Sequence, residues 1–239
     1  MKNKILLILI FLILFSLYIL YNRIYEGYDN SSTKKYVIIT TCLIDEMSEK
    51  RKEEYILGIN SVKKRCKNKN YTLIIVENNG ERKTFLDDFN IDICYTNNNK
   101  LNTINKGVKE LYDVLDVIKK FNINDDDFII KMTGRYELNN ESVFFDETDN
   151  IENTNYDAII KYGNFNDDTI YRTKTNDCIT GLIGLRAKYI KTINNSLDNP
   201  DPIEWSWANS TFQIPDNKIC ILSNLGIKIN LFKSDTINI

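Results

Sequence analysis

The stretch DDDFIIKMTGRYEL, residues 125–138, contains the strand on which the fold depends. Three acidic residues lead into the apolar run Phe128 to Ile130, and a polar tip follows from Lys131 to Arg135. A short apolar run bounded by polar and turn-forming residues is typical of a buried strand. We therefore expect a central strand here, and its polar tip raises the question of which chemistry it serves.

Apolar runs of the same kind precede this stretch in the chain. Residues 36–44 (YVIITTCLI) and 71–81 (YTLIIVENNGE) are continuous and rich in β-branched residues, as expected for strands covered on both faces. The second run ends in a turn at Asn79-Gly80. Residues 91–96 (IDICYT) predict a short third strand.

Two segments between these strands have helical periodicity. Residues 48–66 have charged first turns followed by an apolar face, and residues 104–118 carry an apolar stripe with Thr103 as the predicted N-cap. The apolar positions are Tyr55, Ile59, Val62 and Cys66 in the first helix, and Ile104, Val108, Leu111, Leu115 and Ile118 in the second. The alternation predicts an α/β fold with a mostly parallel sheet and helices on both faces.

The second half of the chain is more irregular. Further strands are expected within residues 156–162, 178–185, 218–223 and 227–232, so the sheet becomes partly mixed. The chain shows no internal repeat and no linker rich in proline or glycine. We therefore predict one domain over residues 35–239.

The N-terminal segment predicts a membrane anchor. Residues 5–21 carry no charge and follow Lys2 and Lys4, and a helix needs about 20 apolar residues, with about 17 as the lower bound, to cross a bilayer. The alternative is a cleaved signal peptide, but no small-x-small cleavage site follows. We expect a tail (1–4), a signal anchor and a stem (22–34), with a type II orientation and a lumenal or extracytoplasmic body.

The composition excludes several classes of function. The net charge of −2 comes from interspersed charges, so the chain has no nucleic-acid-binding surface of the polybasic kind. It has no histidine, which removes Ser-His-Asp and Cys-His catalysis. The five cysteines form no C-x-x-C pair, which argues against zinc. Any general base is therefore a carboxylate, lysine, tyrosine or cysteine.

Polar residues follow three of the predicted strands, and ligands of open α/β sheets bind beyond the carboxyl ends of strands. Glu77, after the second strand, offers a carboxylate to a ribose or a base edge, with a solvated turn residue as the alternative. Gly134 would let a ligand approach the backbone, and Arg135 offers a planar fork for phosphate. The alternative for this pair is a turn with a surface salt bridge.

These segments in this order resemble a known family. YVIITT, LIIVENNG, NTINKGVKEL and DDFIIKMTGRYEL are similar to the nucleotide-binding half of GT-A-type glycosyltransferases, most of all to small virus- and microbe-type, family-2-like members. The resemblance covers residues 36–138. It implies that Glu77 is the nucleoside-binding acid and that Asn105-Lys106-Gly107 opens the helix before the central strand.

The chain departs from this family at the end of the central strand. The family usually carries Asp-x-Asp there, which binds a divalent metal, whereas this chain has Thr133-Gly134-Arg135. We predict no metal ligands at this position, although Mn or Mg remains possible. Lys131, Thr133 and Arg135 alternate along the strand and are expected on one face, so Arg135, with Lys131, would neutralise the departing diphosphate.

Two acidic segments are rival metal sites. Asp125 to Asp127 precede the central strand and so lie at its wrong end, where a helix-to-strand turn is the simpler interpretation. Asp167-Asp168 lies on a predicted loop.

The acceptor is expected in residues 139–239. In residues 178–190 (CITGLIGLRAKYI), Gly181 permits close packing or a close sugar. Glu204 lies beside Trp205 and Trp207, and it is the candidate general base, because a carboxylate must take the proton from the acceptor hydroxyl. The alternative is that both tryptophans pack a helix start that has Glu204 in its first turn.

The sequence thus predicts a membrane-anchored glycosyltransferase that uses a nucleotide-sugar donor and a saccharide or glycoprotein acceptor. The alternatives are an inert, lectin-like or structural protein that retains the fold, and a nucleotidyltransferase. The donor-binding candidates are Thr40, Thr41, Glu77, Asn78, Asn105, Lys106, Lys131, Thr133, Gly134 and Arg135. The acceptor candidates are Gly181, Trp205 and Trp207, with Glu204 catalytic.

Overall fold

The computed structural model describes residues 33–44, 47–140, 142–163, 177–198, 200–230 and 236–238, together with residues 15, 16 and 18. The predicted anchor, apart from those three residues, and the stem before residue 33 lie outside the described residues. Within the described part of the chain, no helix is both long enough and apolar enough to cross a membrane. Residues Thr33–Ile239 form one compact unit.

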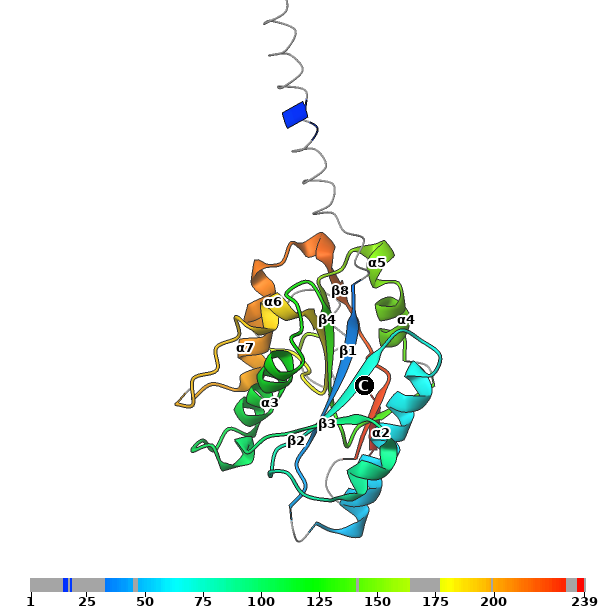
Figure 1. The fold of residues 1–239 in the computed structure, drawn as a ribbon, viewed down its shortest axis with the longest axis vertical. Helices are drawn as coiled ribbons and strands as arrows, with labels where there is room; N and C mark the ends of the chain where they lie inside the picture. Colours follow the sequence, from blue (N-terminus) through cyan, green and yellow to red (C-terminus); the bar gives the residue numbers. More distant parts are fainter. Residues whose placement is uncertain are drawn as a thin grey trace, which may run out of the picture. The chain divides into compact units, whose positions relative to one another are not determined.

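A seven-stranded sheet runs through this unit in the order β3-β2-β1-β4-β7-β6-β8 (Figure 1). The strands are β1 (Lys35–Thr41), β2 (Thr72–Glu77), β3 (Asp92–Tyr95), β4 (Phe128–Thr133), β6 (Ala158–Ile160), β7 (Leu182–Arg186) and β8 (Ile219–Ile221). The first four strands pair in parallel, β7 is antiparallel to β4 and β6, and β6 pairs with β8 in parallel. The mostly parallel, partly mixed sheet is therefore confirmed, and it is consistent with a GT-A-like fold.

A smaller antiparallel sheet joins the turn after β4 to the C-terminal strands. It has the order β10-β9-β5, with β5 at Glu137–Leu138, β9 at Ile227–Asn230 and β10 at Thr236–Asn238. This pairing fixes the chain immediately after the polar tip of β4.

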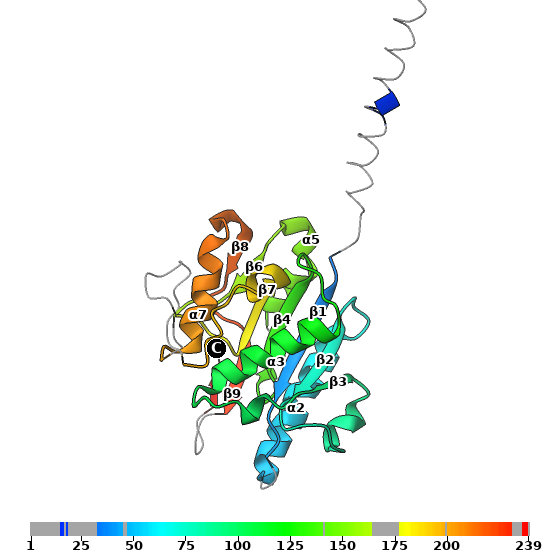
Figure 2. The same ribbon diagram turned by 60° about the vertical axis from the view of Figure 1, so that its left-hand side comes forward.

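Helices cover both faces of the large sheet. They are α2 (Glu49–Cys66), α3 (Lys106–Lys120), α4 (Phe144–Asp149), α5 (Ile151–Thr154), α6 (Ala187–Ile190) and α7 (Ile203–Ser210), with short 3-10 turns at Phe85–Phe89, Asn98–Lys100, Thr211–Gln213 and Asp216–Lys218. Figure 1 shows α3, α6 and α7 on one face and α2 and α4 on the other, and Figure 2 shows α3 in front of the sheet. Each face has its own apolar core, as expected for a sheet buried on both sides.

Helix α2 forms as its sequence predicts. Ser48 caps it by accepting a hydrogen bond from the Arg51 backbone N–H at 3.3 Å. The predicted apolar face is buried against the sheet. Gly58 is buried too, and a Cβ at this position would lie 2.2 Å from the Gly134 carbonyl oxygen. The glycine therefore lets α2 pack directly on the turn after β4.

The start of α3 differs from the prediction. Its N-cap is Asn105, whose side chain accepts hydrogen bonds from the backbone N–H groups of Gly107 and Val108, so Thr103 is the wrong residue. Thr103 instead accepts a hydrogen bond from the Asn105 N–H. Ile104 consequently lies before the helix and is fully exposed, whereas the rest of the predicted stripe packs on the sheet.

Asp125 to Asp127 lie at the amino end of β4, where the turn interpretation is confirmed. Asp127 is buried and accepts hydrogen bonds from the backbone N–H groups of Lys34 and Asn124. Asp126 and Asp125 form ion pairs with lysines that follow β7. These carboxylates therefore hold together the edge opposite the candidate site.

Candidate functional site

The order of the sheet marks the carboxyl edge beside the end of β1 as the place where a ligand is expected, and we call this edge the crevice. Strand β1 lies between β2 and β4, so the chain winds outward in one direction through β2 and β3 and returns on the other side at β4. In open α/β sheets, ligands bind beyond the carboxyl ends of the strands at such a reversal. Most of the predicted donor-binding residues lie at this edge, and Asn105 and Lys106 lie at the start of α3.

Glu77 is at the edge but points into the protein. Its side chain is fully buried and accepts hydrogen bonds from the Thr41 hydroxyl at 2.7 Å and from the Leu43 backbone N–H at 3.1 Å. Asn79 donates from its backbone and side chain, and the Arg82 guanidinium lies 3.4 Å away. We call this group (Thr41, Leu43, Glu77, Asn79 and Arg82) the Glu77 cluster. Glu77 is therefore not a solvated turn residue, and it ties the end of β2 to the loop after β1.

Asn78 points to the opposite face of the sheet, into a second buried network. Its side-chain amide donates to Asp113 of α3 at 3.0 Å, and Thr96 and Asn98 donate to the same carboxylate at 2.7 and 2.9 Å. Burial raises the pKa of Asp113 to about 7, although all three hydrogen bonds oppose that shift. This network fixes α3 to the ends of β2 and β3.

The threonines and the glycine at the edge also serve packing. The hydroxyls of Thr40 and Thr41 bond to protein acceptors and are buried. A Cβ at Gly134 would lie 2.9 Å from the Thr40 carbonyl oxygen and 3.1 Å from methyl groups of Ile39 and Thr41. Close packing against β1 and α2 is therefore sufficient to explain why position 134 is a glycine, and no ligand is needed for that explanation.

Lys131 is buried and has three partners. Its ammonium lies 2.5 Å from a Glu110 carboxylate oxygen, 3.0 Å from the Thr133 hydroxyl and 2.9 Å from the Thr180 carbonyl oxygen. An ammonium has three donors, so these partners use all of them. Glu110 comes from α3 and keeps about a third of its side chain exposed. The ion pair therefore leaves this carboxylate partly exposed.

The alternation along the strand predicted that Arg135 and Lys131 share a face, and this prediction is wrong. Strand β4 ends at Thr133, and the following turn directs Arg135 toward α2, where its guanidinium lies 3.7 Å from Glu54. About a third of the Arg135 side chain remains exposed. Arg51 lies nearby, since both arginines lower the pKa of Tyr55, which burial raises overall and whose hydroxyl bonds to Cys42. Arginines therefore gather around the loop after β1.

Glu204 lies on the Lys131 side of the crevice. Burial, and then the charges of Glu110 and Glu204, raise the pKa of the Tyr136 hydroxyl, while Arg135 opposes the shift. Cys178 donates to the backbone carbonyl of Glu204 at 3.3 Å. Within the described part of the chain, the Glu204 carboxylate has no hydrogen bond or ion pair. We call Glu110, Lys131, Tyr136 and Glu204 the Lys131 cluster.

The acceptor candidates are divided between the core and the surface. Trp207 is buried in the core under α7, which fits the packing alternative, and Trp205 is 42% exposed. A Cβ at Gly181 would lie 2.4 Å from the Tyr136 ring, so Gly181 makes room for that ring. Glu204 is in the first turn of α7, as the same alternative expects.

Sequence reasoning missed Glu110, Tyr136, Arg51 and Arg82. One signal for Glu110 was available, because a lysine inside a buried strand needs an acidic partner. The helix before the strand supplies that acid. Tyr136 and Arg51 became candidates only through the packing of α2 and the turn after β4. Arg82 became one through its contacts with Glu77 and the Leu43 carbonyl oxygen.

The residues at the end of β4 do not fit a divalent-metal site. Thr133-Gly134-Arg135 offers no carboxylate, and the nearest acid on α3, Glu110, is paired with Lys131. Among the described residues, no three acidic or cysteine side chains gather as metal ligands would. Asp167-Asp168 lies outside the described residues.

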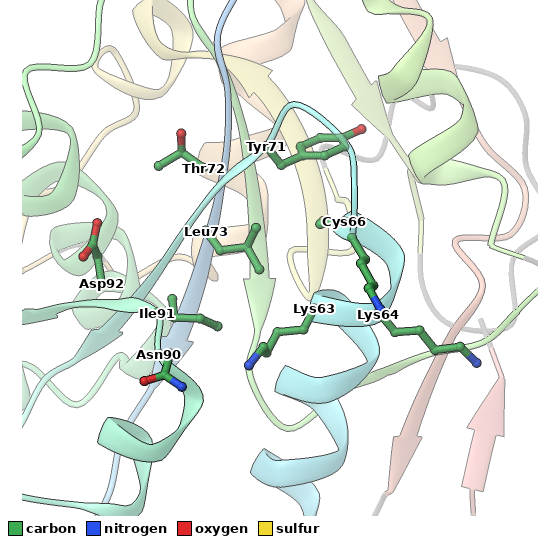
Figure 3. Close-up of a pocket in the computed structure, with 10 residues that line it drawn as sticks. Lys63, Lys64, Cys66, Tyr71, Thr72, Leu73, Asn90, Ile91 and Asp92 are labelled. Carbon is green, nitrogen blue, oxygen red and sulfur yellow. The ribbon is translucent and has the colours of Figure 1, made fainter.

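A hollow of about 890 Å³ lies elsewhere, between the C-terminal half of α2 and the starts of β2 and β3 (Figure 3). Tyr71, Leu73 and Ile91 line it together with three lysines. It lies at the amino edge of the sheet, so it is separate from the crevice.

No model of a protein family matches the chain, and no curated protein sequence matches it. Two solved structures are similar over most of its length. One is assigned to a nucleotide-diphospho-sugar transferase from Desulfovibrio desulfuricans G20 (8% identity, TM-score 0.43, 80% of this chain and 80% of that chain). The other is a glycosyltransferase involved in the glycosylation of the major capsid of PBCV-1 (11% identity, TM-score 0.42, 78% of this chain and 80% of that chain).

Proposed function

We propose that the chain is a glycosyltransferase that moves a sugar from a nucleotide-sugar donor to a glycan or glycoprotein acceptor. The observation that supports the proposal best is the Lys131 cluster at the carboxyl edge, beside the reversal of strand order. Glu110 is ion-paired with Lys131 and partly exposed, and burial and then the charges of Glu110 and Glu204 raise the pKa of Tyr136. Ligand sites of open α/β sheets occupy this position.

Glu204 acts as the general base. It takes the proton of an acceptor hydroxyl, and the hydroxyl oxygen bonds to the anomeric carbon of the donor sugar. The bond between that carbon and the diphosphate oxygen breaks, and its electron pair leaves with the nucleoside diphosphate. A carboxylate without a competing partner is suited to this role, because an ion-paired acid is a weaker base.

Arg135 stabilises the charge of the departing diphosphate, with Arg51 nearby. The Arg135 guanidinium is partly exposed and lies 3.7 Å from Glu54, which is too long for a strong hydrogen bond. Lys131 contributes indirectly, since its three donors already hold Glu110, Thr133 and Thr180. Loss of activity in EDTA and its return with manganese would contradict this assignment.

Nucleotide binding tests the proposal first. At about 100 Kd of the matching ligand among UDP, GDP and CMP, the melting temperature should rise by about 5–10 °C. Arg135→Gln should raise the Kd about 10- to 100-fold, because charge-assisted hydrogen bonds contribute roughly 1.5–3 kcal/mol.

Arg65→Gln is the matched control, because Arg65 pairs with Asp146 away from the crevice and its loss should leave nucleotide binding unchanged. No shift with any of the nucleotides would support the inert, lectin-like alternative instead. If Arg135→Gln bound the nucleotide with wild-type affinity, Arg135 would only form a surface ion pair with Glu54 and would not bind the nucleotide.

The proposal includes a membrane anchor at residues 5–21, with the catalytic unit on the lumenal or extracytoplasmic side. The uncharged run behind Lys2 and Lys4 supports it. Release of the protein from membranes by carbonate at high pH, without detergent, would contradict it.

A further inference from the structure

A hollow on the outer side of α7 is separate from both clusters of the crevice. It has a volume of about 620 Å³ and lies between α7, the turn Thr211–Gln213 and the segment after α6. Trp205 and Phe212 line it and are 42% and 40% exposed. Single exposed aromatic residues are common, but two that line one hollow provide adjacent apolar faces in a concave site.

The rest of the lining is polar and nearly uncharged. Asn194, Asn209 and Gln213 contribute amides, and Thr192 and two serines contribute hydroxyls. Asp201 is the one ionisable group among the lining residues that the structure describes. The hollow at the amino edge has three lysines instead, and Figure 3 labels two of them, Lys63 and Lys64. Among the described residues that line this hollow, an anionic ligand would therefore find no cation, whereas a neutral polyhydroxylated ligand would find donors and acceptors.

Some of these polar groups are already oriented by the fold. The Gln213 amide N–H donates to the Thr192 hydroxyl at 2.9 Å, which leaves the amide oxygen as an acceptor. The Asn194 side-chain oxygen accepts from the Ser196 N–H at 3.1 Å, which leaves its NH₂ as a donor. A sugar hydroxyl donates and accepts, and the C–H face of a sugar ring is apolar. The pattern therefore matches a saccharide.

One end of the hollow lies beside the start of α3. The Asn105 side chain donates to the Asp201 carbonyl at 3.1 Å, so the Asp201 end of the hollow lies beside the start of α3. Glu204 and Trp205 are neighbours on α7, which is about 12 Å long for its 8 residues. A chain of sugars longer than one ring could thus contact both places.

We propose that this hollow binds a neutral oligosaccharide, and that the acceptor of the reaction is such a chain. That the acceptor is such a chain rests on the proposed function, whereas saccharide binding at the hollow does not. The terminal sugar of the acceptor then binds in the catalytic crevice, and sugars further along the oligosaccharide bind in the hollow.

The test is binding of the full chain, without nucleotide, to a printed array of neutral and acidic glycans. Neutral oligosaccharides should bind, and Trp205→Ala should weaken their binding about tenfold or more, since an exposed aromatic face contributes roughly that much. Leu57→Ala is the matched control, because Leu57 is a similarly exposed apolar residue on α2 and its loss should change nothing.

Fluorescence gives a second readout on soluble glycans from the array. The chain has two tryptophans and Trp207 is buried, so a spectral change on binding reports on Trp205. Phe212→Ala keeps this reporter and should raise the Kd about tenfold, whereas Gln213→Ala should raise it severalfold.

The outcomes separate the two proposals. Absence of glycan binding, preference for acidic glycans alone, or wild-type affinity in both aromatic variants would overturn the saccharide site. Glycan binding by a chain whose melting temperature responds to no nucleotide would support the saccharide site and contradict the proposed transferase.

Discussion

The Glu77 cluster and the Lys131 cluster lie at the carboxyl edge of one sheet, but the fold uses them differently. Both oxygens of Glu77 are occupied by donors from the two adjoining strand ends and from Arg82. Glu204, in the other cluster, has a carboxylate that bonds to nothing in the described part of the chain. An acid at this edge can thus have both oxygens bound by donors of the fold, and the acid without such partners is the better candidate for chemistry.

Removing Glu77 should have the largest effect on stability. Glu77→Ala leaves Thr41, Leu43, Asn79 and Arg82 without their shared acceptor, and breaking a buried charged pair costs about 3–5 kcal/mol. The midpoint of urea unfolding should fall accordingly. If the free energy of unfolding of Glu77→Ala lay within about 1 kcal/mol of the wild-type value, Glu77 would not have the structural role that distinguishes its cluster from the Lys131 cluster.

The Asp113 network should make stability depend on pH. The folded pKa of about 7 exceeds the ordinary value of 3.8, so between these values the folded chain binds more protons than the unfolded chain. Stability should therefore fall as pH rises through this window, by at most about 1.4 kcal/mol per pH unit, and level off above it.

Asp113→Asn should remove this component from urea unfolding measured at a series of pH values. Asp92→Asn, which changes an exposed acid at the start of β3, should retain the wild-type slope. The same slope in Asp113→Asn as in the wild type would show that Asp113 is not the titrating group.

Local patterns predicted the helices and strands of this fold, because hydrophobic periodicity and capping or turn-forming residues are signals within a few neighbouring residues. The buried face of α2, the Ser48 cap and the central strand β4 all follow from such patterns. The cap of α3 did not, since Thr103 and Asn105 are both good caps and the path of the loop decides between them.

The site was harder to predict for a different reason. Glu77 lies at the expected edge, but its orientation depends on the loop after β1, and Arg135 turns toward α2 only because β4 ends at Thr133. The pairing of Lys131 with Glu110 joins residues of a strand and a helix. Such contacts belong to tertiary packing, which a single sequence does not display.

The most direct test of the account is Glu204→Gln, which should have the smallest effect on stability of the three changes. Nucleoside diphosphate release from the donor with a mixture of glycan acceptors should fall about 10²- to 10⁴-fold, because the general base is lost. The melting temperature and the Kd of the nucleoside diphosphate should match the wild type. Unchanged turnover in this variant would contradict the assignment of catalysis to the Lys131 cluster.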